Sequence, residues 1–181
     1  MFCARVIVVS YAAEAKLLFF LNGRARVFGY NLDAMSQALS PLELNKIIAR
    51  RFLKIWDAGG EALVHDLAAP DILFSHSRLQ EPMRGAALLQ QVLEQTHETF
   101  PDMRIEADDV IAEGAQVVVY WTYRATHRSN VLFGIAASGK RVQVSGVTLY
   151  RIENHKVVEE FAFSDTMSLM LQLGATPSRA E

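Results

Sequence analysis

The sequence predicts an α+β domain in which three amino-terminal helices pack on a curved, mostly antiparallel sheet. Helical patterns, with apolar residues three or four apart, occupy much of residues 42–100. Patterns with a period of two dominate residues 103–164. This order, with helices first and strands afterwards, is typical of folds in which the helices lie on one side of the sheet.

The composition is that of a globular protein with one packed core. Of the 181 residues, 51% are hydrophobic and 21% are charged, which suits one domain with an extension rather than two domains. The net charge of -2 supplies no broad basic field for a phosphate backbone, so we expect no nucleic-acid partner. The single cysteine, Cys3, cannot form an internal disulfide, which favours a cytoplasmic location.

The first 34 residues differ in character from the rest. Their apolar runs, VIVVSYAA and LLFFL, are divided by Glu14 and Lys16, and neither run approaches the roughly 20 apolar residues of a membrane helix. We therefore expect no membrane span, and we interpret the segment as a disordered appendage or the product of an upstream start codon. A short signal peptide is the weaker alternative. The expected organisation is an extension, a domain and a tail, over residues 1–34, 35–176 and 177–181.

The first helix of the predicted domain has a complete start signal. Ser40 is the expected N-cap, Pro41 the first helical residue, and Glu43 lies at the capping-box position. Apolar residues then recur every three or four positions until the sequence DAGG ends the helix. Two further helices are expected over residues 61–67 and 86–100, and the sequence FPD stops the last one.

Short segments with alternating polarity predict the strands. The segment ILFSH, at residues 72–76, is a short strand between the second and third helices. Consecutive strands, joined at the sequences EG, SGK and ENH, are expected over residues 103–114, 115–127, 141–152 and 156–164.

Alternation along the last strand separates its acids. Phe161, Phe163 and Asp165 fall on one face of the strand. Glu160 falls on the other face, where we expect it to be solvated, and Glu159 is a candidate for a subunit interface. Asp165 therefore shares its side with two aromatic rings.

The hairpin before Asp165 predicts its cross-strand neighbours. If Asn154 and His155 form a two-residue loop, the register of the two strands follows. This register places Asp165 on a concave, aromatic wall beside a glycine that leaves space. The predicted pairs are Phe161 with Thr148, Phe163 with Gly146 and Asp165 with Val144.

An acid in such a position can act as a general acid or base. A carboxylate among aromatic rings is poorly solvated, which raises its pKa toward the range where it can accept and donate a proton near neutrality. His127 shares a strand face with Trp121 and Tyr123 and could tune that proton. Such a pair can abstract a proton next to a carbonyl, protonate an oxyanion or activate water, with no metal or organic cofactor.

The order of several short motifs resembles the SnoaL-like polyketide cyclase family. The segments FPDMRIEADDVIAEG, SGKRVQVSGVTLYRI and DTMSLMLQLGA are similar to that family's FPD, EGD turn, TGK, arginine-bearing strand and closing D-x-x-x-L-x-x-Q-L-G. The resemblance spans roughly residues 42–175. Departures lie in the sequence ATHRS, where the family has GTH-x-G, and at Phe161, where it has Trp.

The resemblance implies an NTF2-like cone around an apolar pocket and a cofactor-independent aspartate that closes a polyketide ester ring by aldol addition. It places Asp165 at the family's carboxy-terminal aspartate and His127 at its GTH histidine, which makes these two the expected catalytic residues. His76 matches the histidine that often ends the first strand. The expected substrate contacts are His76, Trp121, Tyr123, Phe161 and Phe163.

Two alternatives remain open from the sequence. Asp165 is also a good N-cap for the helix that follows it, which requires no catalysis. The chain could be a non-catalytic module that binds a small apolar ligand, and the exposed face of such a sheet commonly forms a homodimer. We expect no metal site, because the histidines show no H-x-H or H-x-x-x-H spacing. The leading hypothesis is an ester cyclase, isomerase or hydrolase for a small apolar carbonyl compound.

Overall fold

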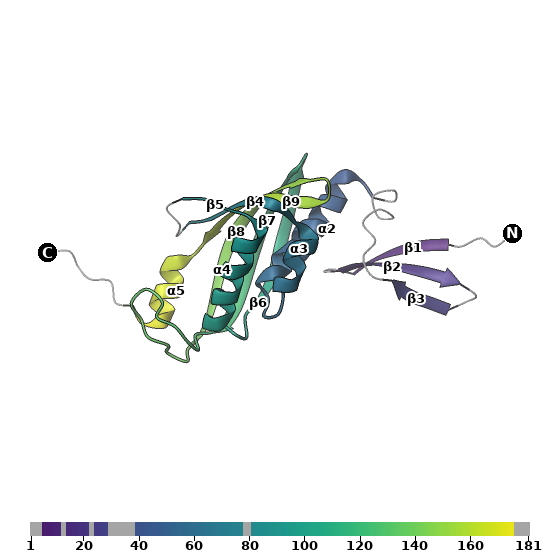
Figure 1. The fold of residues 1–181 in the computed structure, drawn as a ribbon. Coiled ribbons are helices and arrows are strands. Elements are labelled where there is room, and N and C mark those ends of the chain that lie inside the picture. Colours follow the sequence, from purple (N-terminus) through teal and green to yellow (C-terminus); the bar gives the residue numbers. More distant parts are fainter. Residues whose placement is uncertain (1–4, 12–13, 22–23, 29–38, 78–80, 176–181) are drawn as a thin grey trace.

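The computed structural model describes two separate sheets (Figure 1). The described residues are 5–11, 14–21, 24–28, 39–77 and 81–175.

Three strands near the amino terminus form an antiparallel sheet. They are β1 (Arg5–Tyr11), β2 (Glu14–Leu21) and β3 (Arg24–Phe28), in the order β1-β2-β3. Among the described strands, none of these three pairs with the larger sheet. That residues 1–34 form an extension outside the domain stays a prediction.

The second sheet has six strands and confirms the predicted α+β class. Its order is β5-β4-β9-β8-β7-β6, and only the β4–β9 pair is parallel. The sequence did not predict β5. The strands are β4 (Ala68–His76), β5 (Met83–Arg84), β6 (Arg104–Glu113), β7 (Gln116–Thr126), β8 (Arg141–Glu153) and β9 (Lys156–Ser164).

The helices agree with the sequence patterns. Ser40 caps the first helix as predicted, because its Oγ accepts a hydrogen bond from the Glu43 amide at 3.3 Å. Figure 1 shows α4 lying across the sheet. The helices are α2 (Pro41–Leu53), η1 (Lys54–Trp56), η2 (Glu61–Leu63), α3 (Val64–Leu67), α4 (Ala86–Thr99) and α5 (Thr166–Leu173).

The core lies between these helices and the inner face of the sheet. Helix α2 contacts β6 and β7, and α4 contacts β4. Phe52 of α2 meets Tyr150 of β8 edge to face, with ring centroids 5.5 Å apart. Both side chains are fully buried, so the helix layer is anchored to the middle of the sheet. Across the described residues, no helix has the length and apolar character needed to cross a membrane.

The β8–β9 hairpin begins as predicted and then changes register. Asn154 and His155 form the two-residue loop, both with positive φ, and Glu153 pairs with Lys156. Pairing then shifts by one residue, because Val158 is an extra residue in β9 between two paired positions.

This bulge reverses the predicted faces of β9. Thr148 pairs with Ala162 rather than with Phe161, and Gly146 pairs with Ser164 rather than with Phe163. A one-residue slip moves every side chain to the opposite face. The predicted register was therefore wrong beyond the bulge, and the inward residues of β9 are Glu160, Ala162 and Ser164.

Candidate active site

A cavity of about 460 Å³ lies between α4 and the inner face of the sheet. Its walls are mostly apolar, with a few polar side chains, as is usual for small-molecule sites. Of the described residues that line it, none is Lys or Arg. The aromatic lining residues are Trp56, Phe74, Phe100, Trp121 and Tyr123, and the acid and imidazole are Glu160 and His76.

Glu160 is the buried acid of this cavity. Its side chain is only 2% exposed, and its Oε1 accepts a hydrogen bond from Trp56 Nε1 at 3.3 Å. Within the described part of the chain, Oε2 has no hydrogen-bond partner. Burial raises the pKa of Glu160 to about 7, although the Trp56 hydrogen bond lowers it. Near neutral pH this carboxyl can therefore either accept or donate a proton.

Tyr150 is the cross-strand neighbour of Glu160. Burial raises the pKa of its phenol well above the ordinary value, and the Glu160 charge raises it further. Tyr150 therefore stays protonated and neutral throughout the range in which Glu160 titrates. Of this cross-strand pair, Glu160 is therefore the member that changes charge near neutral pH.

Trp121 forms a fixed wall of the cavity. Its Nε1 donates a hydrogen bond to Thr148 Oγ1 at 2.8 Å, and its ring stacks on Tyr123 at 6.0 Å between centroids. The indole lies over Gly146, where a Cβ atom would be 2.4 Å from the ring carbons. The glycine therefore makes room for the indole, whereas the sequence prediction gave that space to Asp165.

His76 lines the cavity at the end of β4. Its Nε2 lies 3.2 Å from Ser164 Oγ, within hydrogen-bonding distance. Ser164 Oγ is also 3.3 Å from Thr166 Oγ1, at the start of α5. His76, Trp121 and Tyr123 are thus the predicted contact residues that line the cavity, and their contact with a substrate stays a prediction.

Asp165 lies outside the cavity. It is exposed and is the N-cap of α5, because its Oδ1 accepts a hydrogen bond from the Ser168 amide at 2.9 Å. The expectation that Asp165 faces an aromatic hollow is wrong, because the bulge in β9 places it and its neighbours Phe161 and Phe163 away from the cavity lining. The side chain of Phe163 is 63% exposed.

His127 is buried but does not line the cavity. Its Nε2 lies 3.1 Å from the carbonyl oxygen of Asn130, and its Nδ1 lies 3.4 Å from Ser138 Oγ. Its ring centroid is 5.8 Å from that of Phe100. Asn130 and Ser138 lie toward the two ends of the loop between β7 and β8, so His127 links these ends. Its contacts are those of a structural residue.

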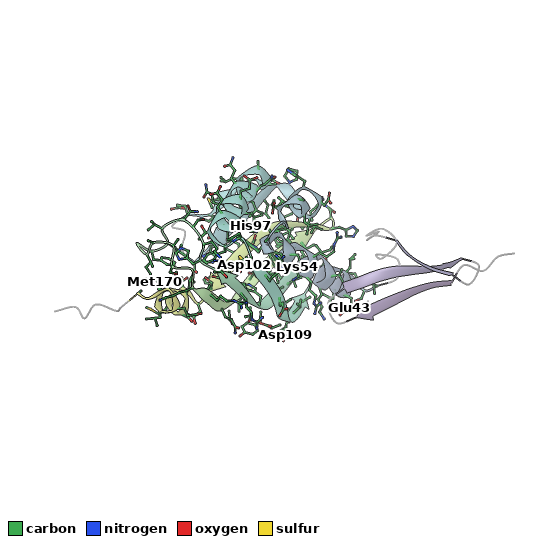
Figure 2. All side chains as sticks on the ribbon, turned by 90° about the horizontal axis from the view of Figure 1, so that it is seen from below. Glu43, Lys54, His97, Asp102, Asp109 and Met170 are labelled. Atoms are coloured by element: carbon green, nitrogen blue, oxygen red, sulfur yellow. The ribbon has the colours of Figure 1, made fainter. Side chains whose placement is uncertain are left out.

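The FPD motif, at residues 100–102, also stabilises the end of β7 next to His127. Asp102, labelled in Figure 2, accepts hydrogen bonds from the Thr126 amide at 2.7 Å and from Thr126 Oγ1 at 2.6 Å. The Thr126 hydroxyl bond is the main reason that the pKa of Asp102 lies below its ordinary value. This acid therefore fixes the chain at the end of β7, next to His127.

Sequence reasoning missed Glu160 because it assumed an unbroken register. The expectation that Glu160 is solvated is wrong, since the side chain is buried beside the cavity. A signal was present in the sequence, because Glu160 shares its strand face with Ala162 and Ser164, two small residues that leave space. Among the described residues, no group of three or more His, Cys, Asp and Glu side chains could hold a metal ion.

Helices packed over a curved sheet, with Glu160 as the acid among the described residues that line a mostly apolar cavity, define a class of small α+β proteins that enclose a pocket. The model of the SnoaL-like polyketide cyclase family matches residues 46–173. The chain therefore belongs to the SnoaL-like polyketide cyclase family, as its motifs predicted.

Solved structures with this fold come from several bacteria. AclR from Streptomyces galilaeus is 24% identical, with a TM-score of 0.65 over 75% of this chain and 99% of that one. TsrD from Streptomyces laurentii is 22% identical, with a TM-score of 0.65 over 76% and 99% of the two chains. IdmH from Streptomyces antibioticus is 20% identical, with a TM-score of 0.59 over 71% and 99%. These likenesses show the fold, and no curated protein matches the chain.

Proposed function

We propose that the protein is a cofactor-independent general acid/base enzyme that acts on a small apolar carbonyl compound, with Glu160 as the group that moves the proton. One observation carries the proposal. A buried carboxyl with a pKa of about 7 borders a mostly apolar cavity and has one oxygen without a partner among the described residues.

Proton removal next to a carbonyl is the step that this site favours. The Glu160 carboxylate takes a proton from the carbon beside the substrate carbonyl, and the electron pair of that C–H bond moves into an enolate. The Trp56 N–H stabilises the carboxylate before the transfer. The protonated Glu160 then returns its proton to the product.

The fate of the enolate decides the reaction. Addition to a second carbonyl of the same molecule gives an aldol-type cyclisation, and reprotonation at another carbon gives an isomerisation. An ester substrate would instead allow Glu160 to activate water for hydrolysis. Membership of the polyketide cyclase family supports the first of these fates.

Deuterium exchange tests the proposed proton transfer without knowledge of the natural substrate. 2-Tetralone, a small apolar ketone, is incubated with the protein in D₂O, and loss of its α-proton signals is followed by NMR. We expect exchange above the buffer rate, rising as pH increases through about 7, because only the carboxylate form of Glu160 accepts a proton.

Two variants of neighbouring acids give a matched comparison. Glu160→Gln keeps the size of the side chain but removes the titrating group, so exchange should fall to the buffer rate. Asp165→Asn keeps a competent N-cap and should exchange like the wild type. Exchange that survives Glu160→Gln and disappears in Asp165→Asn would restore the assignment made from the sequence.

The alternative is a module that binds a ligand or a second copy of itself without catalysis. Its support is the apolar outer face of the sheet, where Ile111, Tyr120 and Phe163 are 64%, 46% and 63% exposed. We propose that this face forms a homodimer. Phe163→Glu should then lower the mass measured by light scattering, whereas Val131→Glu, on a loop, should not. A wild-type monomer at high concentration would refute the dimer.

A further inference from the structure

The cavity has a second polar end, remote from Glu160. Glu160 and Ser164 lie four residues apart on the inner face of β9, so their Cα atoms are about 13 Å apart. His76 pairs with Ala162, between these two positions. His76 Nε2 lies 3.2 Å from Ser164 Oγ, so the imidazole contacts this end of the cavity.

The two polar ends belong to one continuous space. Glu160, Ser164 and His76 all line the cavity of about 460 Å³. The residue between them on the inner face of β9 is Ala162, whose methyl group leaves the floor of the cavity open. Trp121 and Phe74 add flat aromatic walls. A ligand that fills this space therefore has an apolar body and can reach a polar group at each end.

The chemistry of the second end fits a neutral oxygen group. A serine hydroxyl offers one donor and two acceptor positions. Among the described residues, Ser164 Oγ has contacts with His76 and Thr166, which leave one position for a ligand. An anion is disfavoured, because the described lining contains no Lys or Arg and does contain the Glu160 carboxyl. A hydroxyl or carbonyl oxygen needs no counter-charge.

We infer that Ser164, held by His76, anchors the substrate by a neutral oxygen group at the end opposite the carbon on which Glu160 acts. The substrate class is thus an uncharged carbonyl compound with a second hydroxyl or carbonyl oxygen across its apolar body. Ser164 contacts the substrate, and His76 is a positioning residue that orients the Ser164 hydroxyl. The assignment of the reacting end rests on the proposed function, but the anchor itself does not.

Binding of two matched ketones tests the anchor. 2-Tetralone has one carbonyl, and 6-hydroxy-2-tetralone adds a hydroxyl on the far ring. By isothermal titration calorimetry, the wild type should bind the hydroxylated ketone about fivefold to tenfold more tightly, as expected for one net hydrogen bond. The 6-carboxylate of 2-tetralone should bind more weakly than 2-tetralone itself.

Variants at the far end separate an anchor from a structural role. Ser164→Ala should lose the preference for the hydroxylated ketone and keep the wild-type affinity for 2-tetralone, and Ser164→Thr should recover part of the preference. His76→Phe should also lower the preference. Ser145→Ala is the control, because it removes a hydroxyl from the neighbouring strand β8 but not from the cavity lining. This variant should keep the preference for the hydroxylated ketone.

The outcomes distinguish failure of the anchor from failure of the proposed function. The anchor would be overturned if the wild type bound the two ketones with equal affinity. It would also be overturned if Ser164→Ala lowered the affinities for both ketones by the same factor. A retained preference without α-proton exchange would refute the catalytic proposal alone. Intact exchange without the preference would refute the anchor alone.

Discussion

Strand β9 and the helix cap that follows it place two acids in opposite environments. On the inner face, Glu160 is buried and its pKa is raised to about 7. After the end of β9, Asp165 is exposed and accepts a hydrogen bond from the Ser168 amide of α5. Only four residues lie between Glu160, which is suited to proton transfer, and Asp165, which is suited to capping. The surroundings rather than the residue type decide which carboxyl can do chemistry near neutral pH.

The largest expected effect is the loss of α-proton exchange in Glu160→Gln. A positioned general acid/base typically contributes a factor of about 10² to 10⁴, so the exchange of 2-tetralone should fall by that order. Asp165→Asn should remain within about twofold of the wild type. Equal losses of exchange in the two variants would remove the contrast between the two acids.

The next effect is the dependence of stability on pH. The pKa of Glu160 is raised from 4.5 to about 7 on folding, so the folded state binds the proton more tightly than the unfolded state does. The associated stabilisation is fully present below pH 4.5 and is lost as pH rises through 7.

That loss amounts to about 3 kcal/mol between pH 4.5 and pH 8. Denaturation of the wild type and of Glu160→Gln by urea, at several pH values, measures it. The difference in the free energy of unfolding between the two proteins should change with pH by roughly that amount. A constant difference would show that Glu160 titrates normally.

A smaller effect is expected at Gly146. A methyl group there would lie 2.4 Å from the Trp121 ring and from the carbonyl oxygen of Phe163. Gly146→Ala should therefore cost about 1–3 kcal/mol in the free energy of unfolding, as overpacking generally does. Ser145→Ala, the control next to it, loses one hydrogen bond with Thr122 and should cost about 1 kcal/mol or less. A Gly146→Ala protein as stable as the wild type would contradict the close contact of Trp121 with β8.

The smallest expected effect is a change in stability at Asp165, which separates its capping role from any role of its charge. Asp165→Ala should cost about 1 kcal/mol through loss of the N-cap, and Asp165→Asn should cost only a few tenths. Thermal denaturation of both variants measures this difference. A large loss of stability in Asp165→Asn would show that the charge of Asp165 has a role beyond capping.

Local signals predicted most of the fold. Ser40, Pro41 and Glu43 mark the start of α2 with short-range contacts that the structure contains. The positive φ angles of Asn154 and His155 fit the two-residue loop predicted for that hairpin. The helices, the main strands and the family could therefore be predicted from the sequence.

The site could be predicted only in part. His76, Trp121 and Tyr123 line the cavity as expected. The acid expected beside the cavity was Asp165, whereas the structure has Glu160 there. The cause is the extra residue at Val158, which no turn residue or proline marks in the sequence. Register beyond a bulge depends on packing against other elements, so alternation alone could not reveal it. The small residues Ala162 and Ser164, on the strand face of Glu160, were the one local signal.

The titration of the Glu160 carboxyl tests the central claim most directly. Carbon-13 NMR of protein labelled at glutamate Cδ, with Glu160→Gln used for assignment, follows this group as pH changes. Burial beside the cavity predicts a midpoint of about 7. A midpoint near 4.5, the ordinary value, would show that Glu160 is solvated and would contradict its role in proton transfer.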